Sequence, residues 1–402
     1  MSVLGETNSL DAIIRSPFLR LNALLEDIEP GAPAIHFHLG EPKTSLPSFL
    51  APVLNEHLVE FGRYPPIKGT PGLREAISAW MGRRYPALRG VIDPEHHVLP
   101  LNGSREGLFS AVFPAKDRRA EIADPAVLIP NPFYQVYAAA TAVAGAEPAF
   151  LPAGPEGGFL PKLDEIDEAV LSRTIGFYLC SPSNPEGAVA NGEYLAQAIA
   201  LARRHDFLLF ADECYSEIYG DAPPPGALEV AQAETGSLDN IVAFQSLSKR
   251  SGLPGLRSGF VAGDPSFLAA FGRFRTVACP QIPLPIQHVS AAAWAEETHV
   301  EAARALYEAN FDVADSILKG RYGYRRPAGS FFLWLNFADF GGGEAAATTL
   351  WKGCGVRVLP GAYLTYAQAN QANPGQDFVR LALVHDADTT REGLARIVAT
   401  LG

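Results

Sequence analysis

The sequence is poor in sulfur-containing residues, with four Cys and two Met among 402 residues. The cysteines are far apart, at Cys180, Cys214, Cys279 and Cys354, and no two of them have Cys-x-x-Cys spacing. This pattern argues against both a disulfide framework and a zinc site built on cysteine. We therefore expect reduced thiols in a cytoplasmic protein.

Long hydrophobic runs are also missing. A membrane helix needs roughly 18–20 apolar residues, and the nearest candidate, residues 138–150, is shorter and contains Glu147. The first residues show no basic stretch followed by an apolar block, as a secretion signal would. We expect no interaction with a membrane.

Basic residues are in the minority, with 32 Lys and Arg against 44 Asp and Glu, which gives a formal net charge of −12. Such a chain is repelled by phosphate backbones, so nucleic acid is not an expected partner. Hydrophobic residues make up 48% of the chain and charged residues 19%, which argues against a disordered chain. The length suggests about two or three domains.

Short apolar runs rich in β-forming residues alternate with helix-like stretches over the first two thirds of the chain. Strands that are apolar along nearly their whole length, separated by helices, predict an α/β fold with a mostly parallel sheet covered on both faces. After residue 285 the pattern changes to that of a smaller α+β unit. We therefore predict an N-terminal arm with part of the small domain over 1–45, a large domain over 46–285 and a small domain over 286–402. The predicted strands of the large sheet are 98–101, 126–130, 174–180, 206–212, 240–246 and 259–263.

Polar residues that follow these strands are site candidates, because ligands of such sheets bind beyond the carboxyl ends of the strands. Gly103, Ser104 and Arg105 follow the first strand, where the loop is either a phosphate cradle or an ordinary strand–helix turn. Tyr134 follows the second, and its ring either stacks on a planar ligand or packs in the core. Asn184 lies in the Pro-rich turn after the third, which is either a rigid binding turn or a simple loop.

The next two strands end in ionisable residues. Asp212 ends a very apolar strand, so its carboxylate needs a cation or a protonated ring as partner, and Tyr215 lies three residues further on. Lys249 sits in a Ser/Gly-rich turn, where burial lowers the pKa of an amine and makes it a nucleophile. Ser246 and Arg257 flank it and suit a phosphate. This set as a whole suits pyridoxal 5′-phosphate.

The chain resembles the class I/II aminotransferases, which are fold-type I pyridoxal-phosphate enzymes, over nearly its whole length. The resemblance implies a dimeric enzyme with a large cofactor-binding domain and a smaller α+β domain. It rests on the following segments, in chain order: Gly40-Glu41-Pro42, YPPIKGTPGLRE with Tyr64, NGSREG, NPFY, SPSNPEG, ADECY, SLSKRSGLPGLRSG and FVRLAL with Arg380.

The resemblance also implies a role for each matching residue. Lys249 would hold the cofactor covalently and shuttle the reacting proton, while Asp212 keeps the pyridine nitrogen protonated. Arg380 would clamp the substrate α-carboxylate beside Gly40 and Asn184. The other implied cofactor contacts are Tyr215 and Asn184 on the ring hydroxyl, Tyr134 on the ring face, Gly103, Ser104, Arg105, Ser246 and Arg257 around the phosphate, and Tyr64 at the phosphate of the neighbouring subunit in a homodimer with shared sites.

The segments HFHLGEPK and FQSLSKRSGLPGLRSGFVAG resemble the succinyldiaminopimelate aminotransferases of lysine biosynthesis. The expected reaction is transfer of an amino group from N-succinyl-LL-2,6-diaminopimelate to 2-oxoglutarate. Aspartate or aromatic aminotransfer and a C–S lyase activity are the alternatives. We expect no metal site, because the His36-x-His38 pair has no third ligand at a suitable spacing. Basic candidates for reading a distal carboxylate are Arg20, Lys68, Arg325 and Arg326.

Overall fold

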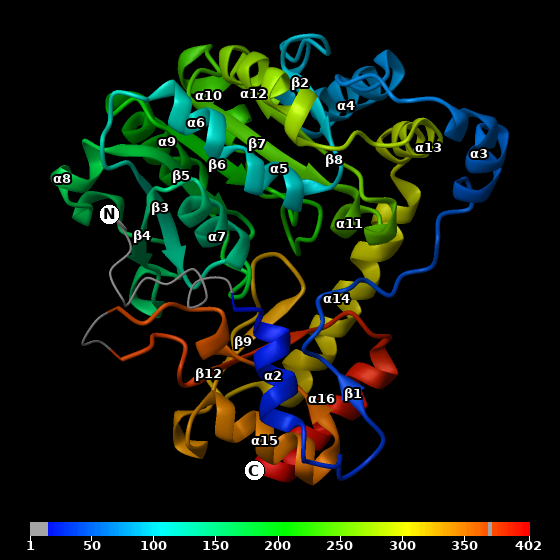
Figure 1. Ribbon diagram of the computed structural model, residues 1–402. Helices are drawn as coiled ribbons and strands as arrows, with labels where there is room; N and C mark the ends of the chain where they lie inside the picture. The colour runs from blue at the N-terminus through cyan, green and yellow to red at the C-terminus, as the bar shows by residue number, and fades with distance from the viewer. Residues whose placement is uncertain (1–14, 369–371) are drawn as a thin grey trace.

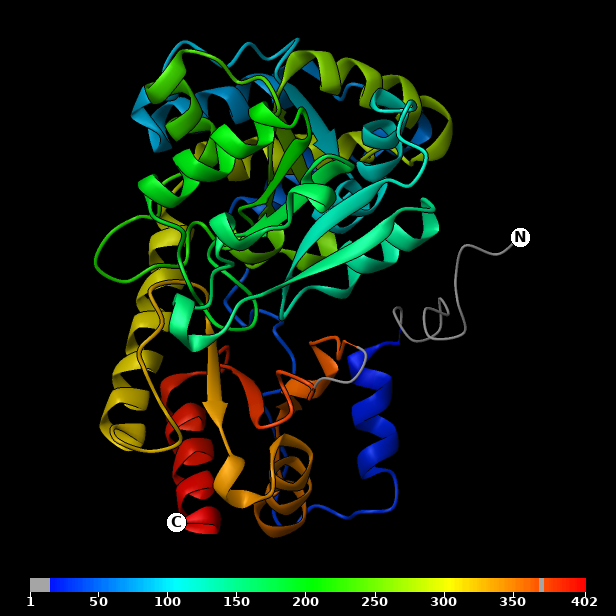
Figure 2. The same cartoon turned by 90° about the vertical axis from the view of Figure 1, so that its left-hand side faces the viewer.

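The computed structural model describes residues 15–368 and 372–402. Its upper part in Figure 1 is built on a large sheet and its lower part on a small one, and the two are connected by the long helix α14 (Thr298–Leu318). Figure 2 shows the same helix running down one edge of the molecule, with α2 (Pro17–Leu25) on the opposite side of the lower part.

The large sheet has seven strands in the order β2-β8-β7-β6-β5-β3-β4. Only β8 runs antiparallel to its neighbours. The fold class is therefore the expected α/β arrangement with a mostly parallel sheet. The strands are β2 (Val98–Leu101), β3 (Ala126–Asn131), β4 (Glu147–Pro152), β5 (Thr174–Cys180), β6 (Leu208–Asp212), β7 (Ile241–Ser246) and β8 (Gly259–Gly263).

Helices cover both faces of this sheet, and the strand residues alternate between two cores. Phe177 and Leu209 point to one face, whereas Tyr178 and Phe210 point to the other. The first face is covered by α4 (Pro71–Arg84), α9 (Gly192–Arg204), α10 (Ala227–Thr235) and α13 (Leu284–Ala295). The second is covered by α5 (Ser104–Ser110), α6 (Val112–Arg118), α7 (Gln135–Val143) and α12 (Pro265–Ala278). Burial from both sides explains why the strands are almost uniformly apolar.

The lower part holds a three-stranded antiparallel sheet, β11-β12-β9, and a two-stranded parallel pair, β1-β10. Since β1 lies early in the chain and pairs with β10, the N-terminal segment joins the small unit. Its strands are β1 (Ile35–His36), β9 (Phe332–Asn336), β10 (Val356–Arg357), β11 (Leu359–Pro360) and β12 (Phe378–Ala382), and its other helices are α15 (Gly343–Cys354) and α16 (Ala387–Leu401).

The helix α13 belongs to the upper part by its packing. Trp294 lies 4.7 Å from Trp80 of α4, measured between ring centroids, and both side chains are almost fully buried. We therefore propose that the boundary between the two units lies near residue 297, between α13 and α14, and not at the predicted residue 285, next to the start of α13.

The one strand of the large sheet absent from the predicted set is β4. It lies at the sheet edge beside β3 and is only partly buried, so it lacks the uniform apolar pattern of the others. Short helices complete the fold: α3 (Leu50–Glu56), the 3-10 turn η1 (Leu58–Gly62), α8 (Glu168–Leu171) and α11 (Leu247–Arg250). Among the described residues, no helix is both long and apolar enough to cross a membrane.

Candidate active site

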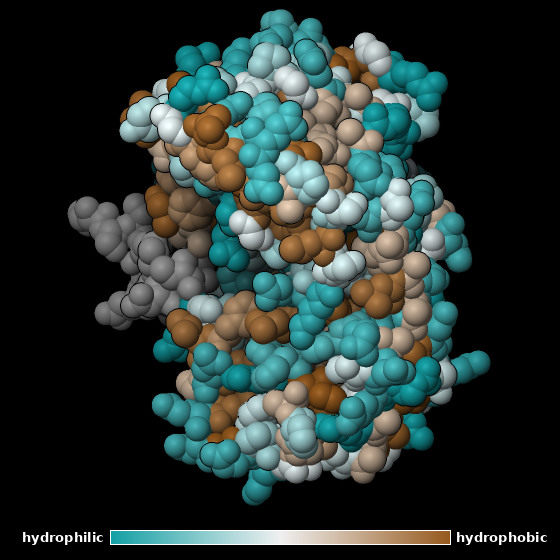
Figure 3. All heavy atoms as spheres, turned by 90° about the vertical axis from the view of Figure 1, so that its right-hand side faces the viewer, coloured by the Kyte–Doolittle hydropathy of each residue, from teal (hydrophilic) through white to brown (hydrophobic). Residues whose placement is uncertain are grey.

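A cavity of about 320 Å³ lies at the carboxyl ends of β5, β6 and β7, where the large unit meets the small one. Its walls come from both units. Asp212 ends a strand of the large sheet and Lys249 follows another, whereas Phe332 and Arg380 belong to strands of the small sheet. Figure 3 shows a recess with hydrophilic atoms between the upper and lower parts of the molecule. The volume is in the range of pockets that hold small-molecule ligands.

Asp212 ends β6 and is 4% exposed. Its carboxylate accepts hydrogen bonds from the hydroxyl of Tyr137 and from the backbone N–H of Cys214. Burial raises the pKa of Asp212, and the bonds from Cys214 and Tyr137 counteract this only in part. Both partners are neutral, so the carboxylate has room for a positively charged ring N–H as a further partner.

Lys249 lies in α11, directly after β7. Its Nζ donates a hydrogen bond to the carbonyl oxygen of Gly40 and lies 5.9 Å from the ring centroid of Tyr215. Burial, assisted by the positive charge of Arg380, lowers the pKa of Lys249 to about 8. Roughly a tenth of the amine is therefore neutral at pH 7, far more than for an ordinary lysine, and this form can attack an aldehyde.

Two guanidinium groups and several hydroxyls form another wall of the cavity. Arg257 has a left-handed backbone (φ 52°) and donates to the carbonyl oxygen of Pro254 at 2.9 Å. A Cβ on Gly103 would lie 2.3 Å from Nη2 of Arg257, so glycine leaves the room that the guanidinium needs. Arg105 donates through Nε to the hydroxyl of Tyr134 at 2.8 Å. Positive charge with Ser104, Ser246 and Ser248 around it suits a phosphate group.

Arg380 lies in β12 and is 4% exposed. Its Nη1 donates to Oδ1 of Asn184 at 2.9 Å, and its Nη2 donates to the carbonyl oxygen of His38 at 2.8 Å. Its Nε has no hydrogen-bond partner among the described residues. Burial lowers the pKa of Arg380 to about 10, so the side chain is still charged at neutral pH and can accept a carboxylate as partner.

The structure brings almost all predicted site residues to this one cavity. They are Gly40, Ser104, Arg105, Tyr134, Asn184, Asp212, Tyr215, Ser246, Lys249, Arg257 and Arg380. Gly103 lies behind the wall, against Arg257. Tyr64 is not at the cavity of its own chain, and its side chain is fully exposed.

None of the four basic candidates for a distal carboxylate lines the cavity. Arg20 donates to the carbonyl oxygen of Ala362, and Lys68 interacts with Glu95. Arg326 forms ion pairs with three carboxylates, and Arg325 is exposed.

Sequence reasoning missed several residues of the site. Tyr137 is the most informative, because it hydrogen-bonds Asp212 and stacks on Tyr178 with a centroid distance of 4.4 Å. Its place three residues after Tyr134 in a helix could have suggested that both face the site. The other missed lining residues include Phe18, Glu41, Cys180, Cys214 and Phe332.

The sequence and the fold are similar to those of known proteins. The sequence profile described as "Aminotransferase class I and II" matches residues 40–397. Among relatives, the LL-diaminopimelate aminotransferase of Gloeobacter violaceus is 29% identical, with 93% of this chain and 92% of the relative covered. An aminotransferase structure from Neisseria meningitidis is 38% identical with a TM-score of 0.90, covering 98% of this chain and 99% of that one. A probable N-succinyldiaminopimelate aminotransferase from Thermus thermophilus is 25% identical with a TM-score of 0.82, covering 96% of this chain and 100% of that one.

The chain therefore belongs to the class I and II aminotransferases, as its motifs predict. It is a pyridoxal-phosphate-dependent transaminase that acts on an amino acid and a 2-keto acid. The cavity fits this cofactor. Around one space lie a buried carboxylate that has no cationic partner among the described residues, a buried amine of lowered pKa and a cluster of arginines and serines.

Proposed function

We propose that the enzyme transfers the amino group of a diaminopimelate-type amino acid, N-succinyl-LL-2,6-diaminopimelate, to 2-oxoglutarate. The observation that supports aminotransfer is that Lys249, Asp212 and Arg380 line one cavity. The donor is supported by the relatives named LL-diaminopimelate aminotransferase and N-succinyldiaminopimelate aminotransferase.

Each residue has a proposed task. Lys249 would hold the cofactor, and its amine would also move the proton of the substrate Cα. Asp212 binds the protonated ring nitrogen, and Tyr215 and Asn184 donate to the ring hydroxyl. Arg380 binds the α-carboxylate of both substrates, beside Gly40. Tyr134 covers the ring. The phosphate is held by Ser104, Arg105, Ser246 and Arg257, and Gly103 leaves the space that the Arg257 guanidinium needs.

When bound, the cofactor would supply an aldehyde group and a ring that can delocalise negative charge. The protein must do the rest. Asp212 keeps the ring nitrogen positive, since a hydrogen bond between charged groups contributes roughly 1.5–3 kcal/mol. The neutral fraction of Lys249 provides a base of suitable strength within the same cavity.

We further propose a cytoplasmic homodimer in which Tyr64 reaches the phosphate site of the neighbouring subunit. The support is that Tyr64 is fully exposed and lies close in sequence to other exposed apolar side chains, Leu58, Val59 and Phe61. Exposed apolar clusters of this kind mark contact surfaces.

A half-reaction tests the substrate. Purified holoenzyme is mixed with one amino donor at a time, without keto acid, and the visible band of the lysine-bound cofactor is followed. We expect the fastest loss of this band with N-succinyl-LL-2,6-diaminopimelate, compared with free LL-diaminopimelate, glutamate, aspartate, phenylalanine and cystathionine.

The other outcomes are equally definite. Faster conversion with free diaminopimelate would show that this compound, and not its succinylated form, is the amino donor. Conversion only with aspartate or phenylalanine would show that the donor is not a diaminopimelate-type amino acid. Release of pyruvate from cystathionine without any keto acid would identify a C–S lyase and overturn the proposal.

A further inference from the structure

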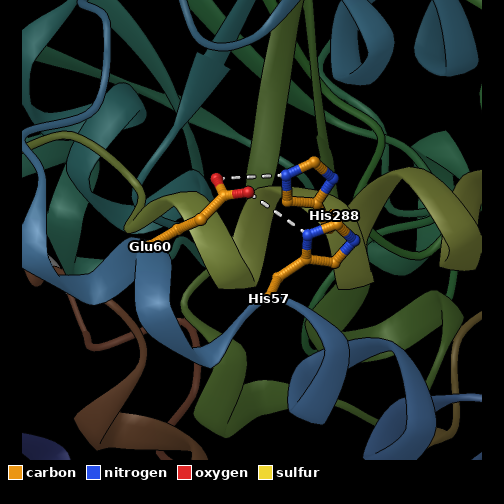
Figure 4. Close-up of side chains that lie close together, drawn as sticks. All are labelled: His57, Glu60 and His288. Carbon is orange, nitrogen blue, oxygen red and sulfur yellow. Dashed lines mark hydrogen bonds and ion pairs between the residues drawn. The ribbon is translucent and has the colours of Figure 1, made fainter.

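A group of three metal-ligating side chains lies outside the active site, where η1 packs against α13. His57 precedes η1, Glu60 lies within it, and His288 comes from α13. Figure 4 shows that one nitrogen of each imidazole ring is turned toward an oxygen of the Glu60 carboxylate. Among the described residues this is the one group of three or more His, Cys, Asp or Glu side chains whose ligand atoms all lie within 4.8 Å of one another.

The distances between these atoms are long for hydrogen bonds. Nδ1 of His57 lies 3.3 Å from Oε1 of Glu60, and Nε2 of His288 lies 3.4 Å from Oε2. Ordinary N–H···O bonds have a length of about 2.9–3.0 Å. Ligands placed about 2.0–2.1 Å from one tetrahedral ion are separated from each other by about 3.3 Å, which is close to both observed values.

The three side chains are only partly exposed, at 23% for His57, 20% for Glu60 and 34% for His288. A bound ion would thus have three protein ligands while water could still reach a fourth position. Two imidazoles and one carboxylate form a donor set that proteins use for zinc. We propose that His57, Glu60 and His288 bind one divalent transition-metal ion per chain, of the Zn²⁺ type, with water as the fourth ligand.

Binding requires a small rearrangement. The rings of His57 and His288 are stacked with centroids 3.6 Å apart and an angle of 6° between their planes. Because the lone pair of each nitrogen lies in its ring plane, parallel rings do not aim at one point, and at least one ring must turn to meet the ion. Arg63, with its Nη2 3.4 Å from Oε2 of Glu60, competes with the ion, but its side chain is 68% exposed and can move into solvent.

The consequence of binding is mechanical. The ion would tie residues 57–60 to α13, next to the exposed side chains Val59 and Phe61. The site is separate from the catalytic cavity, since none of its three ligands lines that cavity. The proposal therefore stands whether or not the proposed substrate is correct.

Isothermal titration of the holoenzyme with Zn²⁺ tests the site. We expect one ion per chain in the wild type and an affinity at least about tenfold weaker in His57→Gln, Glu60→Gln and His288→Gln, since even the loss of an outer partner of a metal ligand commonly costs 10–100-fold. The matched control is His96→Gln, because His96 forms a similar pair with Asp93 at 3.4 Å but has no third ligand in the part of the chain that the structure describes. It should bind zinc like the wild type.

Two results would overturn the site. One is a wild type that takes up no zinc, a result that does not depend on any variant folding. The other is unchanged affinity in all three ligand variants, which would place the ion on a thiol or on the cofactor. Co²⁺ gives a second readout: its visible absorption should show tetrahedral coordination in the wild type and in His96→Gln, and lose it in His288→Gln. Retained aminotransferase activity of the variants verifies their folding.

Discussion

At the scale of single residues, burial acts on all three principal ionisable groups of the active site in the same sense, toward their neutral forms. It raises the pKa of Asp212 and lowers the pKa of Lys249 and of Arg380. Only the effect on Lys249 matches the proposed chemistry directly, because that residue needs a neutral amine. At Asp212 burial opposes the charged carboxylate that the ring nitrogen requires, and the hydrogen bonds from Tyr137 and Cys214 offset this in part. The hydrogen bonds and charges around each group therefore determine how far its pKa departs from the ordinary value.

The lowered pKa of Lys249 predicts a pH dependence. Below pH 8 the amine is mostly protonated and cannot attack the cofactor aldehyde, and above it the amine is mostly neutral. The rate at which apoenzyme captures pyridoxal phosphate should therefore rise with pH and level off above a midpoint near 8. Stopped-flow absorbance at a series of pH values measures this. A midpoint close to 10.5, the ordinary value for lysine, would show that the amine is not desolvated.

Lys249→Ala should show neither the covalent band nor turnover.

The hydroxyl of Tyr137 stabilises the charged form of Asp212 by a hydrogen bond. A hydrogen bond to a charged group contributes roughly 1.5–3 kcal/mol, so Tyr137→Phe should lower kcat by about tenfold or more. The matched control is Tyr178→Phe. Tyr178 stacks on Tyr137, but its hydroxyl donates to the carbonyl oxygen of Leu108. That variant should lose stability and keep kcat; equal loss of kcat in both would assign the effect to packing.

Arg380 should affect both half-reactions, because the amino acid and the keto acid both carry a carboxylate next to the reacting carbon. Arg380→Ala should raise KM for each by roughly tenfold or more, from the loss of charge-assisted hydrogen bonds. Arg380→Lys retains the charge without the planar fork and should give an intermediate KM. Steady-state kinetics with each substrate varied in turn provide the values. An effect on one substrate alone would contradict the assigned role.

The residues of the site were predictable to the extent that they follow strands. Asp212, Lys249 and Asn184 are polar residues at the ends of apolar runs, and the rule about strand ends locates them without a structure. Tyr137 lies inside an Ala-rich helix, and its partner Asp212 is 75 positions away. His57 and His288 are more than 200 positions apart. No local pattern reports such pairs, because the tertiary fold alone brings them together.

At the scale of elements, uniform burial made the central strands recognisable. The predicted ranges 98–101, 174–180 and 259–263 coincide with β2, β5 and β8. Where burial is incomplete, as in β4, the pattern fades. The direction of β8 is also invisible locally, because an antiparallel strand buried on both sides has the same composition as a parallel one. The region after residue 285, predicted as the smaller unit, begins with two helices, α13 and α14, which pack in different units.

The attachment of α13 to the large unit gives a prediction of stability. Trp294 is fully buried against Trp80 and Phe260, and the guanidinium of Arg250 lies 4.9 Å from its ring. Trp294→Ala should lower the free energy of unfolding by about 3–5 kcal/mol. Urea unfolding followed by circular dichroism measures this. Val277→Ala, at a side chain that is 93% exposed, is the control and should stay within about 0.5 kcal/mol of the wild type.

At the scale of the whole molecule, Tyr64 is the predicted site residue that a single chain leaves away from the cavity and the proposed dimer would bring to it. In the single chain this side chain contributes nothing to the cavity, although it belongs to a motif that the family resemblance assigns to the cofactor phosphate. Sequence reasoning could name the residue but could not show where it lies. A site completed by a neighbouring subunit accounts for both observations.

Shared sites predict complementation between two defective chains. Tyr64→Ala lacks the residue that a chain lends to its partner, whereas Lys249→Ala lacks the residue that it uses itself. In a mixed dimer one site has both defects and the other has none. Random exchange of subunits between equal amounts should therefore restore about a quarter of the wild-type sites, since half of the dimers are mixed and each has one intact site.

The measurement is turnover after the two variants have been mixed, denatured and refolded together, compared with each variant treated alone. Lys249→Ala should be inactive alone and Tyr64→Ala impaired by weaker cofactor binding, so the mixture is assayed at limiting pyridoxal phosphate. Activity equal to the average of the separate preparations would mean that Tyr64 serves its own chain or none. Activity above that average requires a residue of one subunit to act in the site of the other, which fixes the dimer as the catalytic unit.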